Sequence, residues 1–251
     1  MPTLRHLLPF LLTALTVLPW ASAGGAESRP SPEIEYVSPD QSVWTIRTNR
    51  NGEPDNPLLA VADALFAKAG LHWRYRSYPT VRMLKYLQDG SAPFSMLVKS
   101  PPLQGCCLLS RKPLTRLEIR VYHLADKPAI NNINELAGKN VISIHGYTYG
   151  ELLGFLNDER NHITNNLAVT HPAAFRMLAR QRADYVIDYV GPASEVLADS
   201  PIPGIQSEIL TNLDVHLVLS KSYPDAVGLM NRLEAIADTL NVDKLMRTSR
   251  R

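Results

Sequence analysis

The segment MLARQRADYVIDYV, residues 177–190, changes from helical to strand-like patterning within a few residues. Its first half belongs to a helix predicted over 172–182, and its second half is a nearly unbroken apolar strand predicted over 184–190. Such runs are typical of strands that are covered on both faces. One carboxylate, Asp188, stands near the end of this strand. Because a buried charge without a partner is costly, the sequence predicts a strong partner for this acid.

The same alternation of helix and strand extends in both directions from this segment. Further strands are predicted at 43–48, 72–78, 94–98, 117–121, 140–145, 167–170 and 213–219. Helices are predicted at 57–69, 81–89, 134–138, 148–156, 192–198 and 222–240. Strands that alternate with helices indicate an α/β protein with mostly parallel sheets.

Two segments are suited to connect separate halves of the chain. The alternation of strands and helices is interrupted at 125–130, which contains Pro128. The strand at 213–219 offers a second connection between the two halves. We therefore expect lobe 1 at 41–124 plus 220–251 and lobe 2 at 128–212, with hinges near 125–128 and 213–219. A single sheet of eight strands is the alternative. Residues 24–40, rich in small and polar residues and proline, are predicted to be a flexible lead-in.

The N-terminus has the pattern of a secretory signal peptide over residues 1–23. Arg5 precedes an apolar run at 7–20, and Ala21-Ser22-Ala23 resembles a cleavage site. A membrane anchor is the alternative, but the apolar run is shorter than the roughly 20 residues that span a bilayer. The sequence thus predicts export to the periplasm. With 26 basic and 24 acidic residues, the chain gives no support for nucleic acid as a partner.

The two cysteines, Cys106 and Cys107, are adjacent in the sequence. They are interpreted as two small buried side chains, and a strained vicinal disulfide or pairing between molecules stays open. No spacing of cysteine and histidine resembles a metal site. We therefore expect neither a metal nor another cofactor.

Three segments resemble a known family. NINELAGKNVISIHGYTYGELL, residues 132–153, resembles the start of the second lobe in bacterial extracellular solute-binding protein family 3, the periplasmic receptors of amino-acid ABC transporters. Residues 177–190 and 77–90 resemble two other segments of that family. The resemblance implies the two-lobed type II periplasmic-binding (Venus-flytrap) fold, with two mostly parallel sheets joined by two hinge crossings and a small ligand in the cleft.

The resemblance also implies site residues in the second lobe. Asp188 matches the acid that holds the amino group of an amino-acid ligand, and the alternative is an ion pair with a nearby arginine such as Arg182. Thr148 and Glu151 form the pattern of a capping box, and the family binds the ligand carboxylate at this loop. Simple helix capping is the alternative for Thr148. Tyr147 is expected to narrow the cleft or to stack on the ligand.

The first lobe departs from the family's pattern. Ser100 matches the serine or threonine that the family has after the third strand. Leu103, however, stands where the family has an arginine that binds the ligand carboxylate. Arg50 and Arg82 are candidate substitutes, although each has the alternative of an ordinary surface arginine. Tyr78 is predicted to form an aromatic wall of the cleft or, alternatively, to pack beneath the next helix.

The sequence therefore predicts a monomeric periplasmic binding protein. It would capture a small polar, amino-acid-like or related solute and deliver it to an ABC permease in the inner membrane. No catalytic constellation is found in the sequence. An enzyme on the same fold, similar to periplasmic dehydratases, and a divergent accessory or sensory module are the alternatives.

Overall fold

The structure is a computed structural model that describes residues 33–50, 52 and 54–248. All of the elements below belong to one compact unit, Ser31–Arg251. The predicted signal peptide, 1–23, lies outside the described residues.

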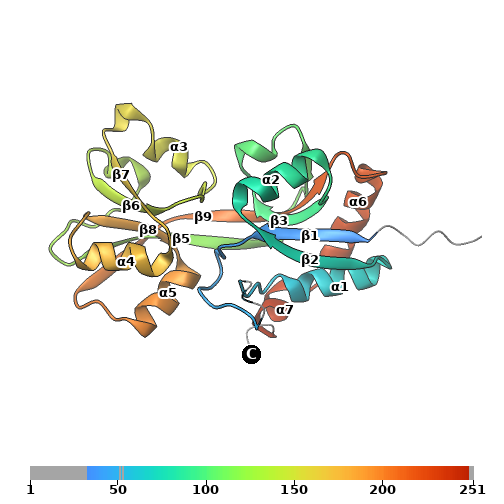
Figure 1. The fold of residues 1–251 in the computed structure, drawn as a ribbon, viewed down its shortest axis with the longest axis horizontal. Coiled ribbons are helices and arrows are strands. Elements are labelled where there is room, and N and C mark those ends of the chain that lie inside the picture. Colours follow the sequence, from blue (N-terminus) through green and yellow to red (C-terminus); the bar gives the residue numbers. More distant parts are fainter. Residues whose placement is uncertain (1–32, 51, 53, 249–251) are drawn as a thin grey trace, which may run out of the picture. The chain divides into compact units, whose positions relative to one another are not determined.

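Lobe 1 is built on parallel strands with helices on both faces. Its strands are β1 (Ile34–Pro39), β2 (Trp73–Tyr78), β3 (Phe94–Val98) and β4 (Cys107–Leu109). Its helices are α1 (Leu59–Ala69), α2 (Thr80–Asp89), α6 (Ala226–Ala237) and α7 (Val242–Thr248), and a 3-10 turn η1 spans Pro101–Leu103. β1 pairs in parallel with β2 and β3, and α1 and α2 cover opposite faces of these strands (Figure 1). Successive side chains of β1 point to opposite faces of the sheet. Tyr36 packs in the apolar core beside α1, and Val37 packs in the apolar core beside α2.

Lobe 2 repeats this plan. Its strands are β6 (Asn140–Ile144), β7 (Thr164–Ala168) and β8 (Tyr185–Tyr189), its helices are α3 (Leu152–Leu156), α4 (His171–Ala179) and α5 (Val190–Asp199), and its 3-10 turns are η2 (Ile133–Leu136) and η3 (Glu159–Asn161). β6 pairs in parallel with β7 and β8. Helices lie on both sides of these strands (Figure 1), so β8 is buried along its whole length.

Two long antiparallel strands, β5 (Thr115–Leu124) and β9 (Ile205–Ser220), connect the lobes. The last third of β9 pairs with β3 in lobe 1, whereas 119–123 of β5 pair with β8 in lobe 2. Among the described residues the strands therefore form one hydrogen-bonded path, β2-β1-β3-β9-β5-β8-β6-β7. The two parallel groups expected from the sequence are present, but they are linked through these strands and are not two separate sheets.

The chain between β5 and lobe 2 is held by lobe 2. Lys127 makes an ion pair of 2.7 Å with Asp184, and the hydroxyl of Tyr185 donates to the carbonyl of Pro128 at 3.0 Å. The lobe boundaries and the hinge positions near 125–128 and 213–219 stay predictions.

The predictions for residues 24–40 and 43–48 were wrong where the structure describes these segments. Residues 34–39, placed in a flexible lead-in, form β1, and its side chains Ile34 and Val37 are fully buried. The strand predicted at 43–48 is instead irregular, with one bridge between Thr48 and Pro54. The prolines and polar residues around β1 suggested a linker, but the short apolar segment is buried on both faces. We call residues 40–58 the strap.

Among the described residues, no helix is both long and apolar enough to cross a membrane.

Both cysteines are free thiols in the structure, and their sulfur atoms lie 2.7 Å apart. Cys107 is buried beside Leu87 and Leu103, whereas Cys106 is half-buried. Burial, followed by the contact with Cys106, raises the pKa of Cys107 to about 12.

We expect Cys107 to resist alkylation while the protein is folded. With a pKa of about 12, only about one thiol in 10,000 is a thiolate at pH 8, and the thiolate is the reactive form. Intact mass after iodoacetamide treatment should show at most one added group in buffer and two in denaturant. Two rapid additions to the folded protein would contradict this, and a mass 2 Da lower with no addition would reveal a vicinal disulfide.

Candidate functional site

A cavity of about 90 Å³ lies between the lobes. Lobe 1 contributes the strap, the middle of β2, the first half of α2 and the ends of β1 and β3, and lobe 2 contributes the loop after β6 and the end of β8. One residue each of β5 and β9 completes the wall. The ends of β1, β3, β6 and β8 are carboxyl ends of parallel strands, where ligands bind in open α/β sheets. Three residues predicted from the sequence line this cavity, namely Ser100, Tyr147 and Thr148.

The described residues that line the cavity carry no charged side chain. Most of the wall is apolar and aromatic. The polar groups come from serine, threonine, tyrosine, asparagine and glutamine, and they include Ser38, Gln41, Ser42, Asn56, Tyr75, Thr80, Ser100 and Thr148. A wall of this kind suits a small molecule with an apolar body and a few hydrogen-bonding groups.

Gln41 contributes a buried polar atom without a hydrogen-bond partner in the described part of the chain. Its side-chain oxygen Oε1 is shielded from solvent and accepts no hydrogen bond from any described residue. Native proteins pair nearly all buried polar atoms, so an exception at a cavity wall is informative.

Asp188 does not line the cavity. Its carboxylate is fully buried and accepts a hydrogen bond from His171 Nδ1 at 2.7 Å and from the Tyr189 amide at 2.8 Å. His171 Nε2 in turn lies 3.1 Å from the hydroxyl of Tyr147, which lines the cavity. The strong partner that the sequence predicted for Asp188 is thus His171 and not Arg182.

The surroundings of Asp188 are apolar and aromatic. Burial raises its pKa above the usual range, and the hydrogen bond and charge of His171 act in the opposite direction. Burial followed by the nearby Asp188 carboxylate raises the pKa of Tyr147, Tyr149 and Tyr189. These tyrosines therefore stay neutral, and they act as hydrogen-bonding and stacking groups.

The loop at Thr148 differs from the prediction of a capping box. The helix predicted from 148 begins at Leu152, and Glu151 makes no side-chain cap. Tyr149 and Gly150 have φ values of 48° and 68°, which a right-handed helix does not allow. Tyr149 stabilises this turn by accepting the amide of Ile144 at 2.7 Å. Thr148 reaches the cavity from an irregular loop, and a helix of this length offers no anion site at its N-terminus.

The predicted aromatic and basic residues of lobe 1 lie outside the cavity. Tyr78 donates to Glu35 Oε1 at 3.0 Å and packs edge to face on Tyr86. Arg50 and Arg82 are exposed, and neither lines the cavity. The structure therefore brings together Ser100, Tyr147 and Thr148 but not the other four candidates. Sequence reasoning missed the cavity residues of the strap, because it predicted a regular strand at 43–48 where the structure has an irregular segment.

The strap is held against lobe 2 beside the cavity. Glu195 of α5 accepts hydrogen bonds from the Thr45 hydroxyl at 2.6 Å and from the Ile46 amide at 2.8 Å. Near the start of α5, Gly191 lies so close to Trp44 that a β-carbon there would be 2.3 Å from the Trp44 carbonyl oxygen. We call this set of contacts the strap lock.

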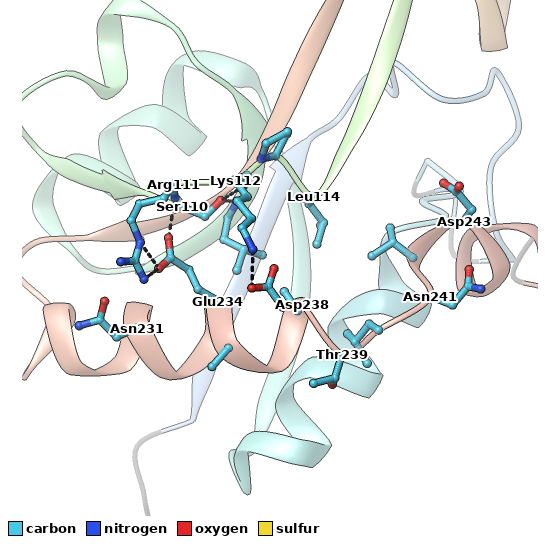
Figure 2. A pocket seen from close by; sticks show the side chains of 16 residues that line it. Ser110, Arg111, Lys112, Leu114, Asn231, Glu234, Asp238, Thr239, Asn241 and Asp243 are labelled. Carbon is cyan, nitrogen blue, oxygen red and sulfur yellow. Dashed lines mark hydrogen bonds and ion pairs between the residues drawn. The ribbon is translucent and has the colours of Figure 1, made fainter.

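A larger groove, of about 860 Å³, lies on lobe 1 between residues 110–114, α6 and α7. In Figure 2 the basic side chains of this groove turn toward its acids. Arg111 binds Glu234 at 2.8 Å, and Lys112 binds Asp238 at 2.7 Å. Because these charges already have partners on the protein, we place the candidate site in the cavity between the lobes.

Metal binding gains no support from the described residues, among which no three histidine, cysteine, aspartate or glutamate side chains gather in a suitable group.

No protein-family model and no curated protein matches the sequence. Solved structures do match. A histidine kinase sensor domain with similarity to periplasmic binding proteins has a TM-score of 0.70 at 15% identity, over 88% of this chain and 95% of that chain. The chain has the fold of the type II periplasmic binding proteins. The two-lobed type II periplasmic-binding fold predicted from the sequence is confirmed.

Two further solved structures with the type II periplasmic binding fold also match this chain. An ancestral arginine-binding protein bound to arginine has a TM-score of 0.66 at 14% identity, over 88% of this chain and 96% of that chain. The substrate binding protein of an amino acid ABC transporter has a TM-score of 0.62 at 13% identity, over 86% of this chain and 96% of that chain. At such identities the likeness concerns the fold alone.

Proposed function

We propose that this protein is a periplasmic ligand-binding clamp that closes on a small uncharged molecule. The supporting observation is a cavity with walls from both lobes and without a charged side chain among its described lining residues. Closure of two lobes around a ligand is a common form of domain movement. The proposal includes descent from solute-binding protein family 3, export through the segment 1–23 and a monomeric state.

The absence of charge from the described wall narrows the expected ligand. An amino acid carries an ammonium and a carboxylate, and enclosing both without ionic partners is costly. The cavity wall includes none of the charged residues proposed to pair with these two groups, namely Asp188 for the ammonium and Arg50 and Arg82 for the carboxylate. We therefore replace the amino-acid-like ligand expected from the sequence with an uncharged one that has an apolar body.

Such a clamp has two candidate functions, transport and sensing. Delivery to an ABC permease is supported by the fold shared with the binding protein of an amino acid transporter. Sensing is supported by the fold shared with a histidine kinase sensor domain. Both uses are binding functions, and we favour them over a dehydratase-like enzyme because these neighbours are described as binding or sensor proteins.

We expect a thermal-shift screen of residues 24–251 to separate uncharged from charged compounds. Nicotinamide, uracil and ribose serve as uncharged probes, and L-arginine, L-glutamate and L-glutamine as charged ones. A compound at about 100 times its dissociation constant should stabilise the protein by about 2.7 kcal/mol, or roughly 5–11 °C in a chain of this size. Stabilisation by the amino acids alone would contradict the proposal, whereas conversion of a stabilising compound would indicate catalysis.

A further inference from the structure

The strap carries part of the cavity wall on one side and the strap lock on the other. Gln41, Ser42, Val43 and Trp44 line the cavity, and the next two residues, Thr45 and Ile46, bind Glu195. The wall is therefore attached by its sequence to lobe 1 and by its hydrogen bonds to lobe 2. Movement of one lobe away from the other must break these bonds or move the wall.

We propose that Gln41 selects ligands that donate a hydrogen bond, and that Glu195 is a positioning residue that holds the wall carrying Gln41 across the cleft. This inference rests on the proposed function. It assigns to the ligand an N–H or O–H group facing lobe 1, in addition to the lack of charge.

Glu195 is well placed for the positioning role. One carboxylate oxygen, Oε2, accepts both the Thr45 hydroxyl and the Ile46 amide, and the Arg47 guanidinium lies 3.7 Å from Oε1. Thr45 is buried, so its hydroxyl needs this acceptor. The adjoining contact between Gly191 and Trp44 leaves no room for a side chain. The lock therefore combines hydrogen bonds with close packing of two backbones.

Gln41 opposes the closed arrangement that Glu195 stabilises. Its Oε1 is shielded from solvent and has no hydrogen-bond partner among the described residues. A buried acceptor without a donor has lost its hydrogen bonds to water, so this oxygen makes the closed arrangement less favourable. Opening of the cleft would return the oxygen to water, and a ligand with a donor would satisfy it in the closed state. Closure is thereby coupled to the chemistry of the ligand.

The first test needs no ligand. In Glu195→Ala, hydrogen exchange of a peptide covering residues 42–47 should become at least about 10-fold faster, because the Ile46 amide loses its acceptor. Asp199→Asn changes an exposed acid on the same helix and should leave this exchange unaltered. Glu195→Gln keeps an acceptor oxygen and should restore part of the protection. Unchanged exchange in Glu195→Ala would overturn the positioning role.

The second test concerns Gln41. Ligand-free Gln41→Met should melt about 2–4 °C higher than the parent protein, because an apolar side chain removes the unpaired acceptor. Gln104→Met, at an exposed glutamine, should show no such rise. A fall in the melting temperature of Gln41→Met would mean that the amide is satisfied structurally, and it would overturn the selective role.

The third test separates this inference from the proposed function. Uracil and nicotinamide donate N–H groups, whereas 1,3-dimethyluracil and N,N-diethylnicotinamide do not. The parent protein should bind a donor probe at least about 10-fold more tightly than its alkylated counterpart, and Gln41→Met should lose this preference. Equal binding of both forms would refute the role of Gln41 while supporting an uncharged ligand. If no uncharged probe binds, the ligand class is refuted, and the two ligand-free tests still decide on Glu195 and Gln41.

Discussion

Asp188→Ala is expected to lower the free energy of unfolding by about 3–5 kcal/mol, because it removes one partner of a buried, hydrogen-bonded polar pair. The carboxylate is fully buried and accepts from both His171 and Tyr189. Its removal leaves those two donors without an acceptor inside lobe 2. In a chain of this size the melting temperature should fall by roughly 6–20 °C, which calorimetry or circular dichroism would measure.

Asp188→Asn is the matched control, because its side-chain oxygen can still accept from His171 or from Tyr189. We expect it to lose clearly less stability than Asp188→Ala. If Asp188→Ala melts at the same temperature as the parent protein and only loses ligand binding, the acid faces the ligand, as the resemblance implied, and the buried arrangement is refuted.

Gly191→Ala should have the second largest effect, because it acts on the strap lock directly. The added β-carbon would lie 2.3 Å from the Trp44 carbonyl oxygen and 3.0 Å from its carbonyl carbon. Backbone atoms cannot rotate away, so the strap must move off α5. Overpacking of this kind costs about 1–3 kcal/mol. We expect a lower melting temperature together with a larger radius of gyration in solution scattering, since the lobes are less firmly held.

Gly154→Ala provides the control for this substitution. Gly154 lies in α3, and nothing is within 4 Å of the position of its β-carbon. Alanine there should leave stability unchanged or raise it by about 0.4–1 kcal/mol. If Gly191→Ala behaves like Gly154→Ala in both measurements, α5 does not hold the strap.

The sequence predicts the regular part of the fold well, because its elements have a clear period. The strand at 94–98 and the helix that ends at Gly90 are found where the spacing places them. Two elements were missed or displaced for physical reasons. β1 is short and surrounded by residues typical of linkers, and the helix near Thr148 starts later because Tyr149 and Gly150 adopt left-handed backbone conformations.

The site was less predictable than the fold. Tyr147, Thr148 and Ser100 reach the cavity because they follow the carboxyl ends of strands, a position that can be read from the sequence. The partner of Asp188 could not be read in the same way. His171 lies 17 residues away in sequence, and their contact exists only because α4 packs on β8. Pattern analysis could not show the contacts between the strap and α5, since they join residues about 150 positions apart.

A crystal structure of the protein with the most stabilising uncharged probe would test the central claim most directly. The account predicts density for the probe in the cavity between the lobes, in contact with Gln41 or Trp44 from lobe 1 and with Tyr147 or Thr148 from lobe 2. A probe bound elsewhere, for example in the groove beside α6 and α7, with the inter-lobe cavity empty, would contradict it.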